Sequence, residues 1–294
     1  MSITKYAAFV KVAELGSLTK AAEALGYSQP AVSHIISSLE SRFGFPLFYR
    51  SRDACTLTEN GEKLLFYCTQ VIKNEAYIED TVHSLNGLLS GSIRVGAVSS
   101  MLTHLVPKII YHFSAAYSNI SISLNELTFK EIASGLKSGS IDIGFTSSRT
   151  SDKIKFIPLF DDPVCLVIPP DHPFRAYETI PVKKLNGCDF IMPSSGYDDV
   201  YEAITDKVEI SPNIKYRVGS DIAVIGMVSN HLGISIMSSQ QAQFLGGAVI
   251  RKEFSEHFHR TLGIAVSSAH CPTPAAKAFI RAARNICGKE SETF

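Results

Sequence analysis

The chain has 294 residues, a length that favours two or three domains over one. Hydrophobic residues make up 45% and charged residues 19%, a globular composition that excludes wholesale disorder and fibrous architectures. The 28 basic residues balance 28 acidic ones, so a generally sticky polycation is excluded. Any contact with nucleic acid must therefore come from a local patch.

The first residues carry no apolar core followed by a small-residue cleavage site, so no secretory signal is visible. The longest nearly uncharged stretch, Val218 to Gly247, is interrupted by Asp221, Asn230, His231 and several serines. A membrane-spanning helix would not tolerate this pattern. We therefore expect a cytoplasmic chain that has no contact with a membrane.

Six cysteines lie far apart, with no C-x-x-C pair and no histidine at metal-ligand spacing. This pattern predicts small buried hydrophobic side chains, with a thiol sensor or a metal site as the alternatives. The six are Cys55, Cys68, Cys165, Cys188, Cys271 and Cys287.

The first 58 residues indicate a small helical domain with three short apolar runs at helical spacing. When Leu18 is the first position of a helix-turn-helix, Ala22 falls where the helices touch and only a small side chain fits. Gly26 then falls in the turn, where a positive φ is needed. Val32 and Ile35 fall on the inner face of the second helix. An ordinary helical hairpin is the alternative.

The second helix of this pair is predicted to expose a polar, short-chained stripe. Ser28 can cap the helix and a proline sits in its first turn, where a missing N–H is harmless. Such a face can enter a major groove, where its side chains match the donors and acceptors of base edges. A merely solvated helix face is the alternative. The predicted DNA-binding stripe comprises Gln29, Pro30, Ser33, His34 and Ser37.

Apolar alternation after residue 43 predicts a two-stranded wing that carries Arg50 and Arg52 at its tip. Up to residue 58, six basic residues stand against four acidic ones, a surplus of two. Phosphate binding would therefore depend on a few contacts, and we include both arginines among the DNA-binding residues.

These residues resemble the LysR-type transcriptional regulators over about the first 65 positions. The resemblance is carried by the segments Ser28–Ser33, Leu47–Arg52 and Leu57–Gly61. His34 and Asn60 depart mildly from the residues most often seen there, and the histidine can alter base preference. The resemblance implies a regulator that binds double-stranded DNA.

A long helix is predicted from about residue 59 to residue 90, since proline is absent and an apolar residue recurs every seven positions. It resembles the family's linker helix, which implies a homodimer or homotetramer. Packing of the stripe on its own chain is the alternative. The repeat consists of Leu64, Val71, Ile78 and Leu85, with Cys68, Val82 and Leu89 beside it.

Strands and helices alternate from residue 91 onward, which predicts parallel sheets built from βαβ units. The expected strands are 93–98, 120–126, 141–146, 164–168, 190–192, 233–237 and 262–266, and the expected helices are 105–117, 129–136, 199–205, 222–230 and 274–287.

The resemblance supplies the arrangement of this region, the fold of periplasmic solute-binding proteins with two α/β lobes and two crossover strands. It implies a winged helix-turn-helix domain at 1–58, a linker helix at 59–90 and an effector-binding domain at 91–294. Lobe 1 would comprise residues 91–161 and 268–294, and lobe 2 residues 162–267.

Motifs for catalysis are absent from the sequence: no phosphate-binding loop, zinc-protease motif, nucleophile elbow or dinucleotide fingerprint occurs. We expect no enzyme, no catalytic residue, no metal and no cofactor.

Hydroxyl-rich loops follow several expected strands, where open α/β sheets bind ligands. Short hydroxyls can donate to a small polar or anionic effector, and helix capping is the alternative. The predicted ligand-binding residues are Ser99, Ser100, Met101, Thr128, Thr146, Ser194, Ser195, Gly219 and Ile222.

The leading hypothesis is a transcription regulator that responds to a small molecule bound between two lobes. A solute-binding protein is a second hypothesis, but it would need an export signal and no helical domain. A thiol-switch regulator is a third, although Cys165 and Cys188 have no adjacent basic cluster to lower a thiol pKa.

Overall fold

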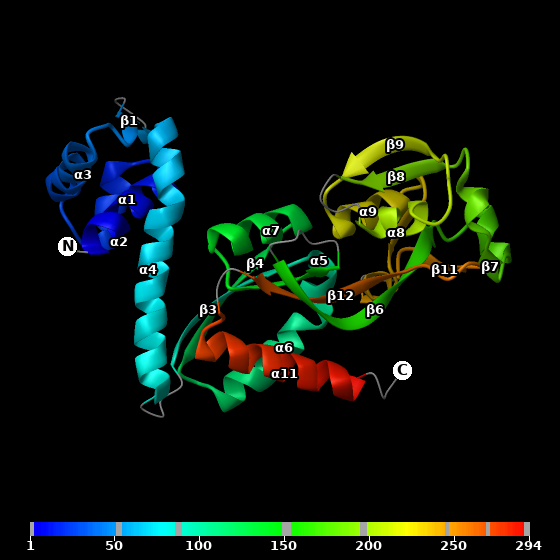
Figure 1. Cartoon of the computed structure of the whole chain (residues 1–294). Helices are drawn as coiled ribbons and strands as arrows, with labels where there is room; N and C mark the ends of the chain where they lie inside the picture. Colours follow the sequence, from blue (N-terminus) through cyan, green and yellow to red (C-terminus); the bar gives the residue numbers. More distant parts are fainter. Residues whose placement is uncertain are drawn as a thin grey trace. The chain divides into compact units, whose positions relative to one another are not determined.

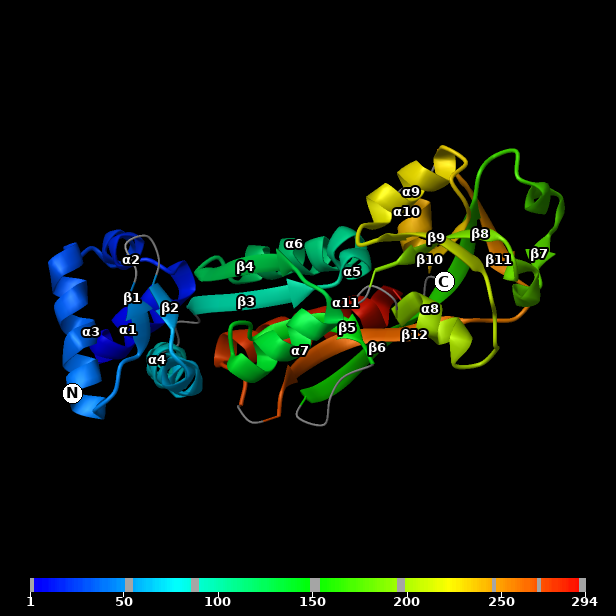
Figure 2. The ribbon, with the colours of Figure 1, turned by 90° about the horizontal axis from the view of Figure 1, so that it is seen from above.

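The computed structural model describes residues 3–50, 55–85, 90–148, 154–194, 199–244, 247–268 and 271–290. The chain divides into two units, Met1–Leu88 and Leu89–Phe294. Each unit has its own buried hydrophobic core. Figures 1 and 2 show the elements of both units.

The first unit is a winged helix-turn-helix, as the sequence predicts. Ser17 caps α2 by accepting a hydrogen bond from the Lys20 N–H, and Gly26 ends that helix with a φ of 70°. The helices pack around Phe9 and Ile36, which are fully buried. The elements are α1 (Ile3–Leu15), α2 (Leu18–Leu25), α3 (Gln29–Phe43), β1 (Phe48–Arg50), β2 (Cys55–Leu57) and α4 (Glu59–Leu85).

The junction between the wing and α4 is tightly packed. The Thr58 hydroxyl donates to the Pro46 carbonyl and accepts from the Gly61 N–H. A Cβ at Gly61 would lie 2.3 Å from the Leu47 carbonyl oxygen, so only glycine fits there. Cys68, predicted beside the seven-residue stripe, is instead buried in the core of this unit together with Phe9.

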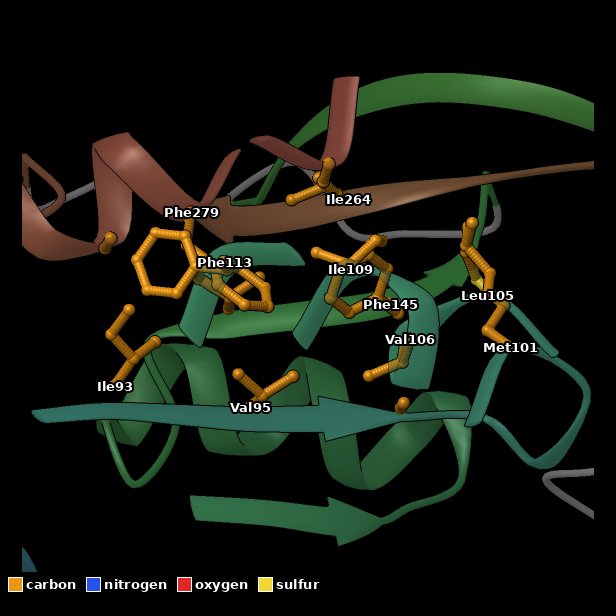
Figure 3. Packing of buried hydrophobic residues seen from close by; sticks show 14 of the residues in the cluster. Ile93, Val95, Met101, Leu105, Val106, Ile109, Phe113, Phe145, Ile264 and Phe279 are labelled. Atoms are coloured by element: carbon orange, nitrogen blue, oxygen red, sulfur yellow. The ribbon is translucent and has the colours of Figure 1, made fainter. Parts of the chain in front are cut away.

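The first lobe of the second unit is a sheet with helices on both faces. Strands β3, β4 and β5 are parallel, and α7 lies on one face while α6 and α11 lie on the other (Figure 1). Phe113 and Phe279 meet edge to face at 5.0 Å in its core (Figure 3). The elements are β3 (Gly91–Ala97), α5 (Ser99–His104), α6 (Val106–Ala116), β4 (Ile120–Glu126), α7 (Phe129–Ser138), β5 (Ile143–Ser147) and α11 (Pro274–Glu290).

Two long antiparallel strands, β6 (Ile154–Ile168) and β12 (His259–Ser267), run side by side and connect the lobes (Figures 1 and 2). The carboxyl half of β6 also pairs with β10 (Ser235–Ser238) and β11 (Ile250–Phe254) of the second lobe. The sequence predicted only this carboxyl half. Pro158 and Pro163 interrupt the strand pattern, since proline lacks the N–H that a ladder needs.

The second lobe contains a core around Phe190 and a two-stranded parallel pair, β8 and β9. Three of its short strands were not expected from the sequence: β7, β9 and β11. Its elements are the 3-10 turns Pro173–Ala176 and Val182–Leu185, β7 (Thr179–Ile180), β8 (Asp189–Pro193), α8 (Asp199–Thr205), β9 (Asn213–Val218), α9 (Asp221–Ser229), β10 (Ser235–Ser238), α10 (Ser239–Phe244) and β11 (Ile250–Phe254).

Within the described ranges, no helix combines the length and the apolar character needed to cross a bilayer.

Candidate DNA-binding face and effector cleft

The amino-terminal half of α3 presents a polar surface. Gln29, Pro30 and His34 are exposed, whereas Ser33 and Ser37 are half-buried. The opposite side of the helix buries Val32, Ile36 and Leu39. Ser28 accepts a hydrogen bond from the Ala31 N–H and so holds the first turn. The structure thus brings the five predicted residues together on one side of a capped helix.

The wing is fastened to the same helix. The Glu40 carboxylate accepts hydrogen bonds from the backbone N–H groups of Leu47 and Phe48, at 2.8 and 3.3 Å. Arg50 ends β1 opposite Cys55, and the predicted Arg52 lies outside the described residues. The wing therefore has a fixed attachment to α3, because charge-assisted bonds hold its first strand.

A polar cavity of about 30 Å³ lies between the lobes. Ser99 and Ser100 reach it from the start of α5, a helix where the sequence predicted a loop. The predicted Ser194 and Gly219 directly follow the paired strands β8 and β9. The Ser194 N–H donates to the carbonyl of Val218, the last residue of β9. Among the described residues, the lining consists of Val98, Ser99, Ser100, Pro193, Val200, Asp221, Ile236, Met237, Ser238 and Arg260.

Several predicted ligand-binding residues lie away from this cavity. The Met101 side chain is 1% exposed within the core of the first lobe, which argues against a ligand contact there. Thr128 caps α7 in a reciprocal arrangement with Glu131, the capping alternative. Ile222 is 71% exposed and does not line the cavity, whereas its neighbour Asp221 does. Ser195 lies outside the described residues.

Thr146, another predicted ligand-binding residue, is buried at the end of β5. Its hydroxyl and that of Ser147 have no hydrogen-bond partner among the described residues. Unsatisfied buried hydroxyls are uncommon because each lacks the bond that water would supply. Their position at the carboxyl edge of the parallel strands is where this sheet type binds ligands.

An ion pair that the sequence did not reveal lies beside this cavity, which we call the cleft. The pair and its two serine partners, Ser100 and Ser238, form what we call the cleft floor. Arg260 on β12 stands directly opposite Asp162 on β6, and its Nε donates to Asp162 Oδ2 at 2.9 Å. The same guanidinium donates to Ser100 Oγ at 2.7 Å. Ser238 donates to the other carboxylate oxygen of Asp162 at 2.7 Å. Side chains from both lobes thus meet on the crossover strands.

The surroundings of Cys165 and Cys188 in the second lobe raise the pKa of both thiols. Burial raises the pKa of Cys165 to about 12, against which a hydrogen bond with Ser239 has a smaller effect. Burial, and then the nearby Asp189, raise the pKa of Cys188 as well. A thiol switch needs a thiolate, so these environments disfavour the redox alternative.

Metal-binding chemistry finds no support in the described parts of the chain, where no group of three or more His, Cys, Asp or Glu side chains could hold a metal ion.

A winged helix-turn-helix unit together with a two-lobed α/β domain and a polar cleft defines a DNA-binding regulator with an effector-binding domain. The family model described as "Bacterial regulatory helix-turn-helix protein, lysR family" matches residues 3–62. The model described as "LysR substrate binding domain" matches residues 86–288. The chain therefore belongs to the LysR family of transcriptional regulators.

One relative supports this family assignment, and two solved structures share the fold. The HTH-type transcriptional regulator YvbU of Bacillus subtilis (strain 168) is 31% identical over 293 residues, which cover 99% of this chain and 100% of that protein. A full-length OxyR variant from Pseudomonas aeruginosa has a TM-score of 0.78 at 22% identity, with 97% of this chain and 95% of that one covered. The effector-binding domain of QuiR in complex with shikimate has a TM-score of 0.62 at 26% identity, covering 68% of this chain and 98% of that domain.

Proposed function

We propose that this regulator reads base edges through the polar side of α3 and binds phosphate through the wing. The supporting observation is the exposed polar start of α3, whose opposite side is locked into the core. Direct base contacts define sequence, whereas cationic contacts define position on the duplex. The base-reading residues would be Gln29, Pro30, Ser33, His34 and Ser37, with Arg50 and Arg52 at the backbone or in the minor groove.

The regulator would bind DNA as a dimer, or as a tetramer built from dimers, through α4. Val71, Ile78 and Val82 are 40%, 63% and 46% exposed, although an apolar residue recurs there at heptad spacing. A helix in water gains by burying such a stripe against a second copy. Two recognition helices could then reach half-sites about 34 Å apart.

The effector would be a small polar or anionic molecule held between the lobes. The cavity lined by Ser99, Ser100, Ser238 and Arg260 is the observation that supports this proposal. The likeness to the QuiR effector-binding domain, which is in complex with shikimate, supports a small-molecule effector in this domain. We propose that the chain works in the cytoplasm by binding alone, without a catalytic step or a cofactor.

A footprint of DNA protected by the purified full chain, repeated with a panel of small polar molecules, tests this function. We expect protection of a two-fold symmetric site, which changes in extent or affinity with at least one panel member. Absence of sequence-specific protection would contradict the DNA assignment. Protection that no small molecule alters would contradict the effector assignment.

A further inference from the structure

A second cavity, of about 370 Å³, lies in the second unit and is separate from the cleft. Among the described residues, the two cavities have no lining residue in common. The first residues of α5 line the cleft, whereas its last residue, His104, and the next one, Leu105, line the second cavity. We call this second cavity the apolar pocket. Its other lining residues include Phe160, Pro163, Arg251 and Cys287.

The apolar pocket lies where β6 has a paired neighbour on one edge only. Residues 154 to 163 pair with β12, and β10 and β11 join the other edge from Val164 onward. Phe160 and Pro163 belong to the stretch before that point. Across it, α5 of the first lobe is bonded to α10 of the second, because the Thr103 hydroxyl donates to Gln241 Oε1 at 2.6 Å. The hollow is therefore bounded by regular elements of both lobes.

The wall of the apolar pocket is mostly apolar. Leu105 and Cys287 belong to the hydrophobic core of the first lobe, and Phe160 packs against that core. An apolar wall in contact with water is unfavourable, and small-molecule sites combine such walls with a few polar groups. A volume of about 370 Å³ has room for about twelve water molecules, or for a ligand of about ten heavy atoms.

Arg251 on β11 supplies unused hydrogen-bond donors at this pocket. Its Nη1 donates to the Ser239 carbonyl at 3.5 Å, a long bond. Among the described residues, its guanidinium makes no other hydrogen bond and no ion pair. A guanidinium has five N–H donors and binds a carboxylate through two parallel bonds. Because Arg251 is exposed, it can hold the charged end of an acid at the rim while the apolar part is buried.

Two carboxylates nearby limit the charge of the ligand. Asp161 lines the apolar pocket, and its Oδ1 already accepts from the Thr261 hydroxyl at 2.8 Å. Glu253 follows Arg251 by two positions on β11 and therefore lies on the same face of the strand. A second negative charge on the ligand would be repelled by these groups. The surroundings thus favour one carboxylate on an otherwise apolar molecule.

We propose that the apolar pocket binds a monocarboxylic acid with an apolar body of about six to ten carbon atoms. Its carboxylate accepts hydrogen bonds from Arg251, and its apolar body lies against Leu105, Phe160 and Cys287. This site goes beyond the proposed function, because it is separate from the cleft and takes a different class of molecule. Its walls come from both lobes, so the bound acid favours one arrangement of the lobes over others.

Calorimetry on the full chain tests the ligand class with octanoate as the probe. Octanamide lacks the charge, butyrate has a shorter apolar body, and suberate has a second carboxylate. We expect octanoate to bind at least tenfold more tightly than each of the three, because each buried CH₂ group strengthens binding about fourfold. Equal binding of octanamide or butyrate, tighter binding of suberate, or no binding of octanoate at millimolar concentration would overturn the proposal.

Two variants at exposed positions separate the charged end of the site from its apolar body. Arg251→Gln should weaken octanoate at least tenfold and leave octanamide within about twofold, because it removes only the carboxylate partner. Gln243→Trp should weaken octanoate and octanamide alike, since Gln243 of α10 lines the pocket and a larger side chain there fills it. Equal losses of both probes in Arg251→Gln, or unchanged binding in Gln243→Trp, would overturn the assignment.

Arg175→Gln is the matched control for Arg251→Gln. Arg175 is also an exposed arginine of the second lobe, its Nη1 donates to the Pro170 carbonyl at 3.3 Å, and it does not line the pocket. Its replacement should leave octanoate binding unchanged. Ser100→Ala shows whether the acid enters the cleft instead. If Ser100→Ala weakens octanoate as much as Arg251→Gln does, the apolar pocket is not the site, and the effector proposal for the cleft still stands.

Discussion

The polar face of α3 and the polar floor of the cleft are built in opposite ways. The face consists of five residues between positions 29 and 37 of one helix, and all five are exposed or half-buried. The floor joins Ser100, Asp162, Ser238 and Arg260 from four separate elements, and Asp162 is fully buried. Groups on the face can form hydrogen bonds with water. Groups at the floor must satisfy one another.

This difference indicates which property a substitution should change, DNA binding or the free energy of unfolding. A polar side chain on α3 can change without leaving a buried group unpaired, so its effect should be confined to DNA binding. A side chain at the cleft floor is itself a hydrogen-bond partner of its buried neighbours. Its removal should reduce the free energy of unfolding as well as ligand binding.

The largest expected effect is that of Asp162→Ala. Removal of the carboxylate leaves the Arg260 guanidinium buried without its counter-charge, and we expect a loss of about 3 to 5 kcal/mol in the free energy of unfolding. Asp161→Ala is the control, because Asp161 is the next residue on β6 and its side chain is 61% exposed. It should lower stability by less than about 1 kcal/mol. Urea unfolding of the full chain measures both, and equal losses would contradict the contrast between floor and surface.

The apolar stripe of α4 is local in sequence, like the α3 face. Unlike that face, its side chains are stabilised when they are buried. Ile78→Asp should raise the dimer dissociation constant at least about 100-fold, because it removes apolar area and places a carboxylate at the seam. Ala76→Asp is the control, since Ala76 is exposed and lies about 200° around the helix from Ile78. Analytical ultracentrifugation checks the pair. Intact Ile78→Asp dimers would place the interface elsewhere.

The helix-turn-helix was predictable because its signals lie within a few residues of one another. Gly26 at a φ of 70°, the Ser28 cap and the buried Val32 and Ile36 all follow local rules. The strand at 120–126 was likewise predicted with the bounds that the structure gives it.

The cleft floor escaped the same rules. Asp162 and Arg260 are 98 residues apart, and Ser100 is 160 residues from Arg260. No local period marks such partners, and Pro163 concealed the strand that carries Asp162. Met101 was misplaced for a related reason: the loop expected after β3 is the helix α5, which turns this side chain into the core.

The third prediction concerns the face itself. Ser33→Glu should weaken operator affinity about 10- to 100-fold, since it removes a base contact and adds a charge that DNA repels. Ser41→Glu is the control on the same helix, because Ser41 is exposed and about 12 Å farther along the axis. Neither change should lower stability by more than about 1 kcal/mol. Titration of labelled operator at one fixed salt concentration decides it, and equal effects would show that the stripe is placed wrongly.

The smallest expected effect is that of Thr128→Ala, which tests whether this residue belongs to the cleft or to its helix. The Thr128 hydroxyl accepts from the Glu131 N–H, while its own N–H and hydroxyl each donate to the Glu131 carboxylate at 2.8 Å. Loss of the cap should lower the free energy of unfolding by about 1 kcal/mol at neutral pH, whereas Thr128→Ser should retain it.

The pH dependence sharpens this test. The bond from the Thr128 backbone, and then the bond from its hydroxyl, lower the pKa of Glu131. A carboxyl whose pKa is lowered by folding adds stability above its unfolded pKa, and that stability is lost as the pH falls through the folded pKa. Because Glu131 is exposed, solvent keeps this contribution small. The difference between Thr128→Ala and the unaltered chain should therefore shrink as the pH falls below the ordinary glutamate range. If Thr128→Ala instead weakens effector binding several-fold at unchanged stability, Thr128 is a ligand contact and the cleft extends to α7.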